Sequence, residues 1–161
     1  MNPSILFLDF DGVLHPVGGA SSAGLFCRLP LFESLLREPE FLQVSIVITS
    51  TWREVYPLDR LLALFSLDIR PRVIGTTPVH KDEDRSFVRY REICAWLKIH
   101  PEVKRWVIVD DAVDQFPSDK RANLVCTDPW IGLESESLHA LRQRLSDNPD
   151  KSAAAQIPLP L

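Results

Sequence analysis

The sequence predicts an α/β fold, with a parallel sheet of about five strands and helices on both of its faces. Short apolar runs rich in β-branched residues recur along the chain, and longer amphipathic stretches separate them. The runs are predominantly apolar, as expected of strands that are buried on both faces of a parallel sheet. Their alternation with helices is typical of strand–helix–strand units, and it indicates the α/β class.

Five apolar runs are predicted to be strands, and four amphipathic stretches between them are predicted to be helices. The expected strands span residues 5–8, 44–48, 72–74, 106–109 and 124–126. The expected helices span residues 31–37, 56–66 or slightly more, 86–98 and 137–145.

Two of these helices have a predicted buried face. Apolar residues in 56–66 recur at the i, i+3, i+4, i+7 spacing that places one side of a helix against a core, and 86–98 has a similar rhythm. Trp96 lies off the predicted face of 86–98. The residues expected to face the core are Leu58, Leu61, Leu62 and Phe65 in the first helix, and Phe87, Tyr90, Ile93, Cys94 and Leu97 in the second.

The length of the chain, 161 residues, suits one domain with one core. We expect this domain to cover residues 1–145. Residues 146–161 lose the periodic pattern and contain three prolines, so a disordered tail is expected there.

The composition indicates a soluble globular protein, with 45% hydrophobic and 25% charged residues. The longest apolar runs fall far short of the ~20 residues that span a bilayer, and the N-terminus has no features of an export signal. A cytoplasmic protein without membrane association is therefore expected. The net charge of −4 gives no overall attraction to nucleic acid, although a local basic groove is compatible with it.

Polar residues follow four of the predicted strands directly. In open α/β sheets, ligands bind beyond the carboxyl ends of the strands, so these residues are expected to meet at one edge. They are Asp9 and Asp11 after the first strand, 49–51 (Thr-Ser-Thr) after the second, 75–77 (Gly-Thr-Thr) after the third, and Asp110 and Asp111 after the fourth.

The two acidic pairs predict phosphoryl transfer with a metal ion. An ionised carboxylate such as that of Asp9 can displace a leaving group from phosphorus and carry the phosphoryl group itself. Gly12 permits a turn that lets Asp9 and Asp11 reach the same ligand. A second acidic strand end, at Asp110 and Asp111, suits Mg²⁺, which prefers carboxylate oxygens.

The motifs at the strand ends resemble those of the haloacid-dehalogenase-like hydrolase superfamily, whose core is a Rossmann-like sheet, and the resemblance covers most of residues 3–145. Within that superfamily, the chain is most similar to the phosphatase-type domains of the Swiss Army Knife RNA repair group. The closer resemblance is carried by 50–53 (Ser-Thr-Trp-Arg), 75–78 (Gly-Thr-Thr-Pro), Arg89 with Glu92 and Ile93, and Gly132 with Leu133.

The resemblance implies roles for the acidic residues. Asp9 is implied as the nucleophile, and Asp11 as the acid that protonates the leaving group and then activates water. An acid at the position of Asp11 marks phosphotransferases and argues against dehalogenation. The ligands implied for Mg²⁺ are the carboxylate of Asp9, the main-chain carbonyl of Asp11 and the carboxylate of Asp111, while Asp110 would orient a basic residue.

The resemblance also implies a hydroxyl group that binds the phosphoryl oxygens. Thr49, Ser50 and Thr51 are the candidates for phosphate binding. Counting from the apolar run favours Thr49, whereas alignment on Trp52 favours Ser50. We expect Ser50 to provide the hydroxyl, with neighbouring main-chain amides completing the cradle.

A basic residue is expected to neutralise the nucleophile and the phosphate. The resemblance implies a lysine before the fourth strand, but the sequence departs from that pattern, and the candidates are Arg89 and Lys81. We expect Arg89, because a guanidinium can bind phosphate with two donors, whereas Lys81 lies in a charged loop. Arg53 either contacts a second phosphate or caps the sheet. His15 is expected to be an exposed residue at the mouth of the site, without a defined role.

The chain leaves little room for a cap over the site. The slot after the first strand holds a glycine-rich loop, 15–24, and one helix, and the slot after the third strand is nearly empty. The expected function is therefore an open-site, Mg²⁺-dependent phosphomonoesterase for phosphorylated substrates, with RNA or DNA ends as the implied class. The alternatives are a phosphatase for nucleotides or metabolites, an inactive module that binds phosphorylated ligands, and a flavodoxin-like response receiver.

Overall fold

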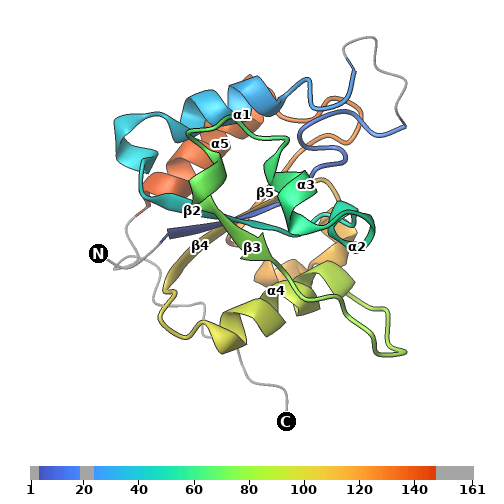
Figure 1. Cartoon of the computed structure of the whole chain (residues 1–161). Helices are drawn as coiled ribbons and strands as arrows, with labels where there is room; N and C mark the ends of the chain where they lie inside the picture. Colours follow the sequence, from blue (N-terminus) through green and yellow to red (C-terminus); the bar gives the residue numbers. More distant parts are fainter. Residues whose placement is uncertain (1–3, 19–23, 148–161) are drawn as a thin grey trace.

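Five parallel strands form one sheet in the computed structural model, which describes residues 4–18 and 24–147. The strand order is β3-β2-β1-β4-β5, so the predicted Rossmann-like parallel sheet is confirmed (Figure 1). A flavodoxin-like receiver has the order 2-1-3-4-5 instead, and the observed order excludes that alternative. The strands are β1 (Ser4–Leu8), β2 (Val44–Ile48), β3 (Val73–Thr76), β4 (Arg105–Asp110) and β5 (Leu124–Cys126).

The register of the three central strands places their ends side by side. Leu8 of β1 pairs with Ile48 of β2 on one side and with Val109 of β4 on the other. The ladder extends one step further, because the amide of Asp9 donates to the carbonyl of Val109 at 3.1 Å and the amide of Thr49 donates to the carbonyl of Leu8 at 2.9 Å. The residues that follow β1, β2 and β4 therefore lie side by side at the carboxyl edge of the sheet.

Helices cover both faces of the sheet, as predicted. Figure 1 shows α1 and α5 together on one face and α4 on the other. The α-helices are α1 (Leu29–Leu36), α2 (Trp52–Val55), α3 (Leu58–Leu62), α4 (Val88–Ile99) and α5 (Ser135–Ser146). The described residues also form short 3-10 helices at Pro39–Phe41, Arg70–Arg72, Val113–Gln115 and Ser118–Lys120.

The alternation of side chains along β1 divides the core in two. Leu6 and Leu8 pack into a cluster that also holds buried residues of α1, α3 and α5. Ile5 and Phe7 point to the opposite face and pack with buried residues of α4. Because successive strand residues face opposite sides, a strand buried on both faces has to be apolar at every position.

The predicted helix at 56–66 is shorter in the structure, because α3 spans only Leu58–Leu62 and Pro57 separates it from α2. Tyr56 has an extended backbone, with φ −115° and ψ 136°, where α2 ends, and α3 begins after Pro57 and ends at Leu62. A residue before proline is disfavoured in the helical region, which explains the break. As a result Leu58, predicted to face the core, is exposed, whereas Leu61 and Phe65 are buried.

The buried face of α4 also differs from the prediction. Trp96 is buried and meets Phe7 of β1 edge to face, with 5.4 Å between the ring centroids. Phe87, predicted to face the core, is exposed and has a left-handed backbone just before the helix. The inner face of α4 is therefore rotated towards Trp96, Ile93 and Leu97.

No folded cap is present among the described residues. Between β1 and β2 the described chain forms a loop, α1 and a 3-10 helix, and α1 lies on the sheet beside α5. Between β3 and α4 only residues 77–87 intervene. Residues 19–23 of the glycine-rich loop and residues 148–161 of the expected tail lie outside the described residues.

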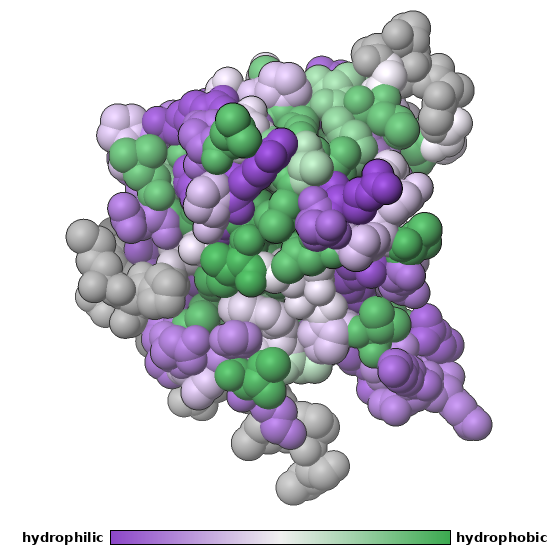
Figure 2. Space-filling view, viewed as in Figure 1, coloured by the Kyte–Doolittle hydropathy of each residue, from purple (hydrophilic) through white to green (hydrophobic). Residues whose placement is uncertain are grey.

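The described surface mixes apolar and charged residues. Figure 2 shows hydrophobic residues around the middle of one face, where Figure 1 places the edge strand β3. Ile74 of β3 is half-exposed. None of the described helices is both long and apolar enough to cross a membrane.

Candidate active site

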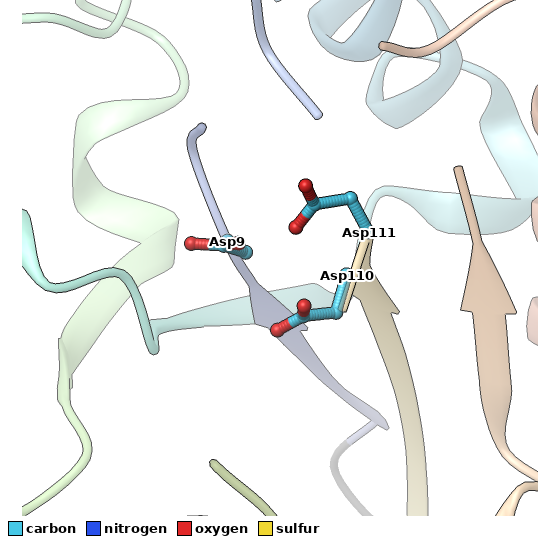
Figure 3. A group of neighbouring side chains, drawn as sticks. All are labelled: Asp9, Asp110 and Asp111. Carbon is cyan, nitrogen blue, oxygen red and sulfur yellow. The ribbon is translucent and has the colours of Figure 1, made fainter. Parts of the chain in front are cut away.

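Three carboxylates meet at the carboxyl edge of the sheet. Asp9 follows β1, Asp110 ends β4, and Asp111 comes next in the chain. One oxygen from each lies within 4.8 Å of the others, and Figure 3 shows the three side chains next to one another at the ends of β1 and β4. Asp9 and Asp110 are buried, and Asp111 is partly exposed. The structure thus brings together three of the four predicted metal-site residues through their side chains.

Arg89 of α4 provides the positive charge of this cluster. Its Nη1 lies 3.2 Å from Oδ1 of Asp9 and 3.6 Å from Oδ2 of Asp110. The same nitrogen donates to the carbonyl of Thr49 at 2.6 Å and to its hydroxyl at 3.1 Å. Burial by itself would lower the pKa of Arg89, but the charges of Asp9 and Asp110 outweigh it and raise the pKa. Arg89 therefore stays charged between the nucleophile candidate and the end of β2.

One guanidinium does not balance three carboxylates. Burial, and then repulsion from Asp9, raise the pKa of Asp110 to about 8, and the same two causes raise the pKa of Asp111 to about 6. Oδ1 of Asp110 accepts the amide N–H of Ala112 at 2.9 Å, whereas Oδ2 is buried without a hydrogen-bond partner. A buried oxygen without a partner among clustered carboxylates fits a divalent cation, which takes oxygen ligands.

Gly12 sets the position of Asp111. Its φ of +72° lies in the left-handed region, and a Cβ built on Gly12 would lie 2.2 Å from Oδ2 of Asp111. The hydroxyl of Thr127, after β5, donates to the carbonyl of Gly12 at 2.7 Å. The sequence indicated a turn at Gly12, but the space that its missing side chain leaves for Asp111 is a tertiary feature.

The side chain of Asp11 belongs to a second group of contacts. Its Oδ1 lies 2.7 Å from Nε2 of His15, and its Oδ2 accepts the indole N–H of Trp52 at 3.1 Å. The side chain of Asp11 is 46% exposed, whereas that of His15 is 3% exposed. The expectation of an exposed His15 is therefore wrong, because the histidine is buried under the loop and bonded to Asp11. The four-residue spacing from Asp11 was the one available signal.

The hydroxyl groups after β2 have different partners. Thr49 and Ser50 are both fully buried, and Thr51 is exposed. The hydroxyl of Thr49 shares Nη1 of Arg89 with Asp9, whereas the hydroxyl of Ser50 accepts the amide N–H of Trp52 at 3.3 Å. These distances favour Thr49 over Ser50 as the hydroxyl beside the nucleophile candidate, contrary to our expectation from the sequence.

Arg53 connects the ends of β2 and β3 to Glu92 of α4. Its Nε donates to the carbonyl of Thr77 at 3.0 Å, and its Nη1 donates to the carbonyls of Thr49 and Ser50 at 2.6 and 2.9 Å. Nη2 forms a buried ion pair with Glu92 at 2.7 Å and also reaches the carbonyl of Pro78. All five N–H groups have protein acceptors, so of its two predicted roles this geometry favours capping the sheet over binding phosphate.

Lys81 lies apart from these contacts. It is exposed in the loop before α4 and forms no ion pair or hydrogen bond with any other described residue. Of the two basic candidates, Arg89 is the one that the fold brings to the carboxylates. Arg89 also lines a pocket of about 400 Å³ together with Arg85 and Gln115, and none of the three clustered carboxylates lines it.

Comparison with known families gives a match over most of the chain. A family model described as the HAD domain in Swiss Army Knife RNA repair proteins matches residues 5–138. This range includes all three clustered carboxylates and Arg89. No curated protein and no solved structure matches the chain.

Proposed function

Because the chain belongs to the family of HAD domains found in Swiss Army Knife RNA repair proteins, we propose that it is a Mg²⁺-dependent phosphomonoesterase for phosphorylated nucleic-acid ends. The observation that carries the proposal is the cluster of Asp9, Asp110 and Asp111 with the guanidinium of Arg89 against Asp9. A carboxylate beside a cation and a metal site has the attributes of a phosphoryl acceptor.

In the first step, a carboxylate oxygen of Asp9 attacks the phosphorus atom. The bond between phosphorus and the leaving oxygen breaks, and Asp11 donates a proton to that oxygen as it departs. The product is an aspartyl phosphate on Asp9 and a free hydroxyl on the substrate. Arg89 and the hydroxyl of Thr49, which lie together beside Asp9, hold the phosphoryl oxygens.

In the second step, water attacks the aspartyl phosphate. Asp11, now ionised, accepts a proton from that water, and the phosphorus–oxygen bond to Asp9 breaks. Inorganic phosphate leaves, and Asp11 is protonated again for the next cycle. The partial exposure of Asp11 supports this role, because the group has to reach both the leaving oxygen and the water.

The carboxylates of Asp9 and Asp111 and the main-chain carbonyl of Asp11 are the proposed ligands of Mg²⁺, with Asp110 next to them. The buried oxygen of Asp110 that accepts no hydrogen bond, and the raised pKa values of Asp110 and Asp111, support a cation here. When bound, Mg²⁺ supplies charge neutralisation for the nucleophile and the phosphoryl oxygens.

The substrate class is proposed from the family and from the open approach. The family description names RNA repair proteins, and the described residues form no folded cap above the carboxylates. A polynucleotide end needs an open site, since the rest of the strand has to remain outside it.

A panel of phosphorylated substrates tests this proposal. Phosphate release with Mg²⁺ is measured for RNA and DNA oligonucleotides with 5′ or 3′ phosphates, for nucleoside monophosphates and for sugar phosphates. We expect the highest kcat/KM on a polynucleotide end. A preference for the mononucleotides or sugar phosphates would assign a small-molecule phosphatase instead. Binding without turnover of any of them would assign a phospho-ligand binding module.

A further inference from the structure

Asp11 is held from two sides by donors that the chemistry described above does not use. Nε2 of His15 meets one carboxylate oxygen at 2.7 Å, and Nε1 of Trp52 meets the other at 3.1 Å. The two donors come from different parts of the chain, the loop after β1 and the start of α2. Each carboxylate oxygen has two lone pairs, so both keep one free for a ligand.

The hydrogen bond at Nδ1 of His15 determines which ring nitrogen carries the hydrogen. Nδ1 accepts the main-chain N–H of Phe26 at 3.3 Å. A neutral imidazole has one donor and one acceptor nitrogen, so Nδ1 is the acceptor and Nε2 carries the hydrogen. The contact therefore directs the Nε2–H of His15 at Asp11.

Phe26 reaches this position through an unusual backbone conformation. Its φ is +58°, in the left-handed region that L-residues other than glycine rarely adopt. Its ring packs against His15 at 4.9 Å and against Trp52 at 5.1 Å between centroids, each in an edge-to-face arrangement. The three aromatic residues thus support one another around Asp11, and strained backbone of this kind concentrates at functional sites.

From this geometry we infer that His15 and Trp52 are positioning residues, which hold the carboxyl group of Asp11 towards the oxygen of the leaving group. The inference rests on the proposed function, in which Asp11 donates a proton to that oxygen as the phosphoryl group moves to Asp9. A carboxyl group on a partly exposed loop can rotate about its side-chain bonds. Two donors on its two oxygens stop that rotation without entering the reaction.

The proton transfer matters most when the leaving group is strongly basic. An alkoxide needs a proton as it departs, whereas p-nitrophenolate leaves readily without one. A residue that only supports the fold would affect both kinds of substrate equally. A residue that aims Asp11 would affect the strongly basic leaving group more.

The test compares His15→Leu, His15→Gln and Trp52→Phe with the wild-type protein. His15→Leu and Trp52→Phe remove the donor and keep most of the bulk, while His15→Gln restores an N–H donor. For each, kcat/KM is measured on p-nitrophenyl phosphate and on an alkyl phosphate, because kcat/KM reports the steps up to departure of the leaving group. Matched controls are His139→Gln and Trp130→Phe, at exposed positions.

We expect His15→Leu and Trp52→Phe each to lose about 10-fold more activity on the alkyl phosphate than on p-nitrophenyl phosphate, within the range of general acid catalysis. His15→Gln should recover part of that difference, and the two controls should show none. Equal losses on both substrates, in variants whose melting temperature and Mg²⁺ affinity are close to wild type, would overturn this inference and leave the proposed function standing. A wild-type protein inactive on every phosphate ester would overturn the proposed function and this inference with it.

If His15→Leu does not fold, Trp52→Phe still decides the question, because it leaves His15 in place. A selective loss in Trp52→Phe supports the inference, and an equal loss on both substrates overturns it. The melting temperature of each variant separates a folding defect from a catalytic one.

Discussion

Nη1 of Arg89 lies 3.2 Å from Oδ1 of Asp9, although 80 residues separate the two in the chain. The contact joins the beginning of α4 to the end of β1, at the edge where β2 and β4 also end. It places a permanent positive charge against the proposed nucleophile. The same nitrogen touches the hydroxyl of Thr49, so one cation connects the ends of two neighbouring strands.

Asp9→Asn is expected to abolish phosphate release, because an amide cannot form the aspartyl phosphate. The substitution keeps the shape of the side chain and removes one charge from a cluster that holds three carboxylates. Stability without metal should therefore be maintained or increased. The measurements are phosphate release and thermal unfolding, and wild-type activity in the Asn variant would refute Asp9 as the nucleophile.

Arg89→Gln is expected to lower kcat by about 100- to 1,000-fold, as loss of a preorganised donor to a developing charge does. Arg89→Lys should keep part of the activity, since it retains the charge but not the planar guanidinium. Arg91→Gln is the matched control, because Arg91 is exposed on the same helix and pairs with Asp84. Equal effects of Arg89→Gln and Arg91→Gln would contradict the role of Arg89.

Thr49→Val is expected to reduce kcat more than Ser50→Ala does. The hydroxyl of Thr49 lies with Arg89 and Asp9, and its loss should reduce kcat by about 100-fold. The hydroxyl of Ser50 accepts the amide N–H of Trp52, so its loss should cost about 0.5–1.5 kcal/mol of stability instead. Steady-state kinetics and thermal unfolding of both variants distinguish the two residues. The opposite ranking in kcat would restore Ser50 as the phosphate-binding hydroxyl.

Mg²⁺ is expected to stabilise the protein, and to do so more at about pH 8 than at about pH 5. In the absence of metal, Asp110 has its pKa raised from 3.8 to about 8 and Asp111 has its pKa raised from 3.8 to about 6. A carboxyl with a raised pKa binds more protons folded than unfolded, so its contribution to stability is present below the ordinary value. That contribution is lost as the pH rises through the raised pKa. Mg²⁺ binds the ionised carboxylates and reverses this loss.

The measurement is the melting temperature with and without Mg²⁺ at both pH values. At a concentration about 100-fold above its dissociation constant, Mg²⁺ should contribute about 2.7 kcal/mol. Asp111→Asn should reduce the shift, whereas Asp119→Asn, which removes an exposed acid that pairs with Lys120, should keep it. A shift of the same size in Asp111→Asn and wild type would contradict the assignment of Asp111 as a metal ligand.

Gly12→Ala is expected to weaken Mg²⁺ binding and activity as well as stability. A left-handed backbone costs a residue with a Cβ about 1–2 kcal/mol. At Gly12 the added carbon would also collide with Asp111. Gly18→Ala is the matched control, because Gly18 has a φ of +84° and no atom of the described residues lies within 4 Å of its Cβ position. Mg²⁺ affinity, measured by calorimetry, should fall in the first variant alone. Equal affinities in the two variants would show that Gly12 has no influence on Asp111.

The strands were predictable because of where they lie. A strand buried on both faces is mostly apolar, so β1, β2 and β4 appear in the sequence as short apolar runs, whereas the edge strand β3 keeps only Val73 and Ile74 of its predicted run. The helix at 56–66 was predicted from an apolar spacing that begins at Leu58, but Pro57 keeps Tyr56 out of the helical conformation and α3 ends at Leu62. Trp96 was predicted to lie off the buried face of α4. The side of α4 that faces the sheet depends on the contact between Trp96 and Phe7, which a helical spacing does not include.

The site was predictable in part for a related reason. The ends of neighbouring parallel strands meet at one edge, so Asp9 and Asp110 could be expected together from their positions after apolar runs alone. The sequence did not distinguish Thr49 from Ser50, because adjacent residues at a strand end differ only in the direction of their side chains. Arg89 and Lys81 are eight positions apart in one segment, and packing of α4 against the sheet brings Arg89 to Asp9.

The sequence by itself determined the α/β class, the approximate strands and the acidic strand ends, since these depend on local pattern and on the level at which parallel strands stop. Only the tertiary structure decided which side chains touch. The contact of Arg89 with Asp9, the use of every donor of Arg53 within the protein, and the enclosure of Asp11 by His15 and Trp52 each join segments from different elements. Such contacts depend on the packing angle and depth of whole elements, which no local spacing of residues specifies.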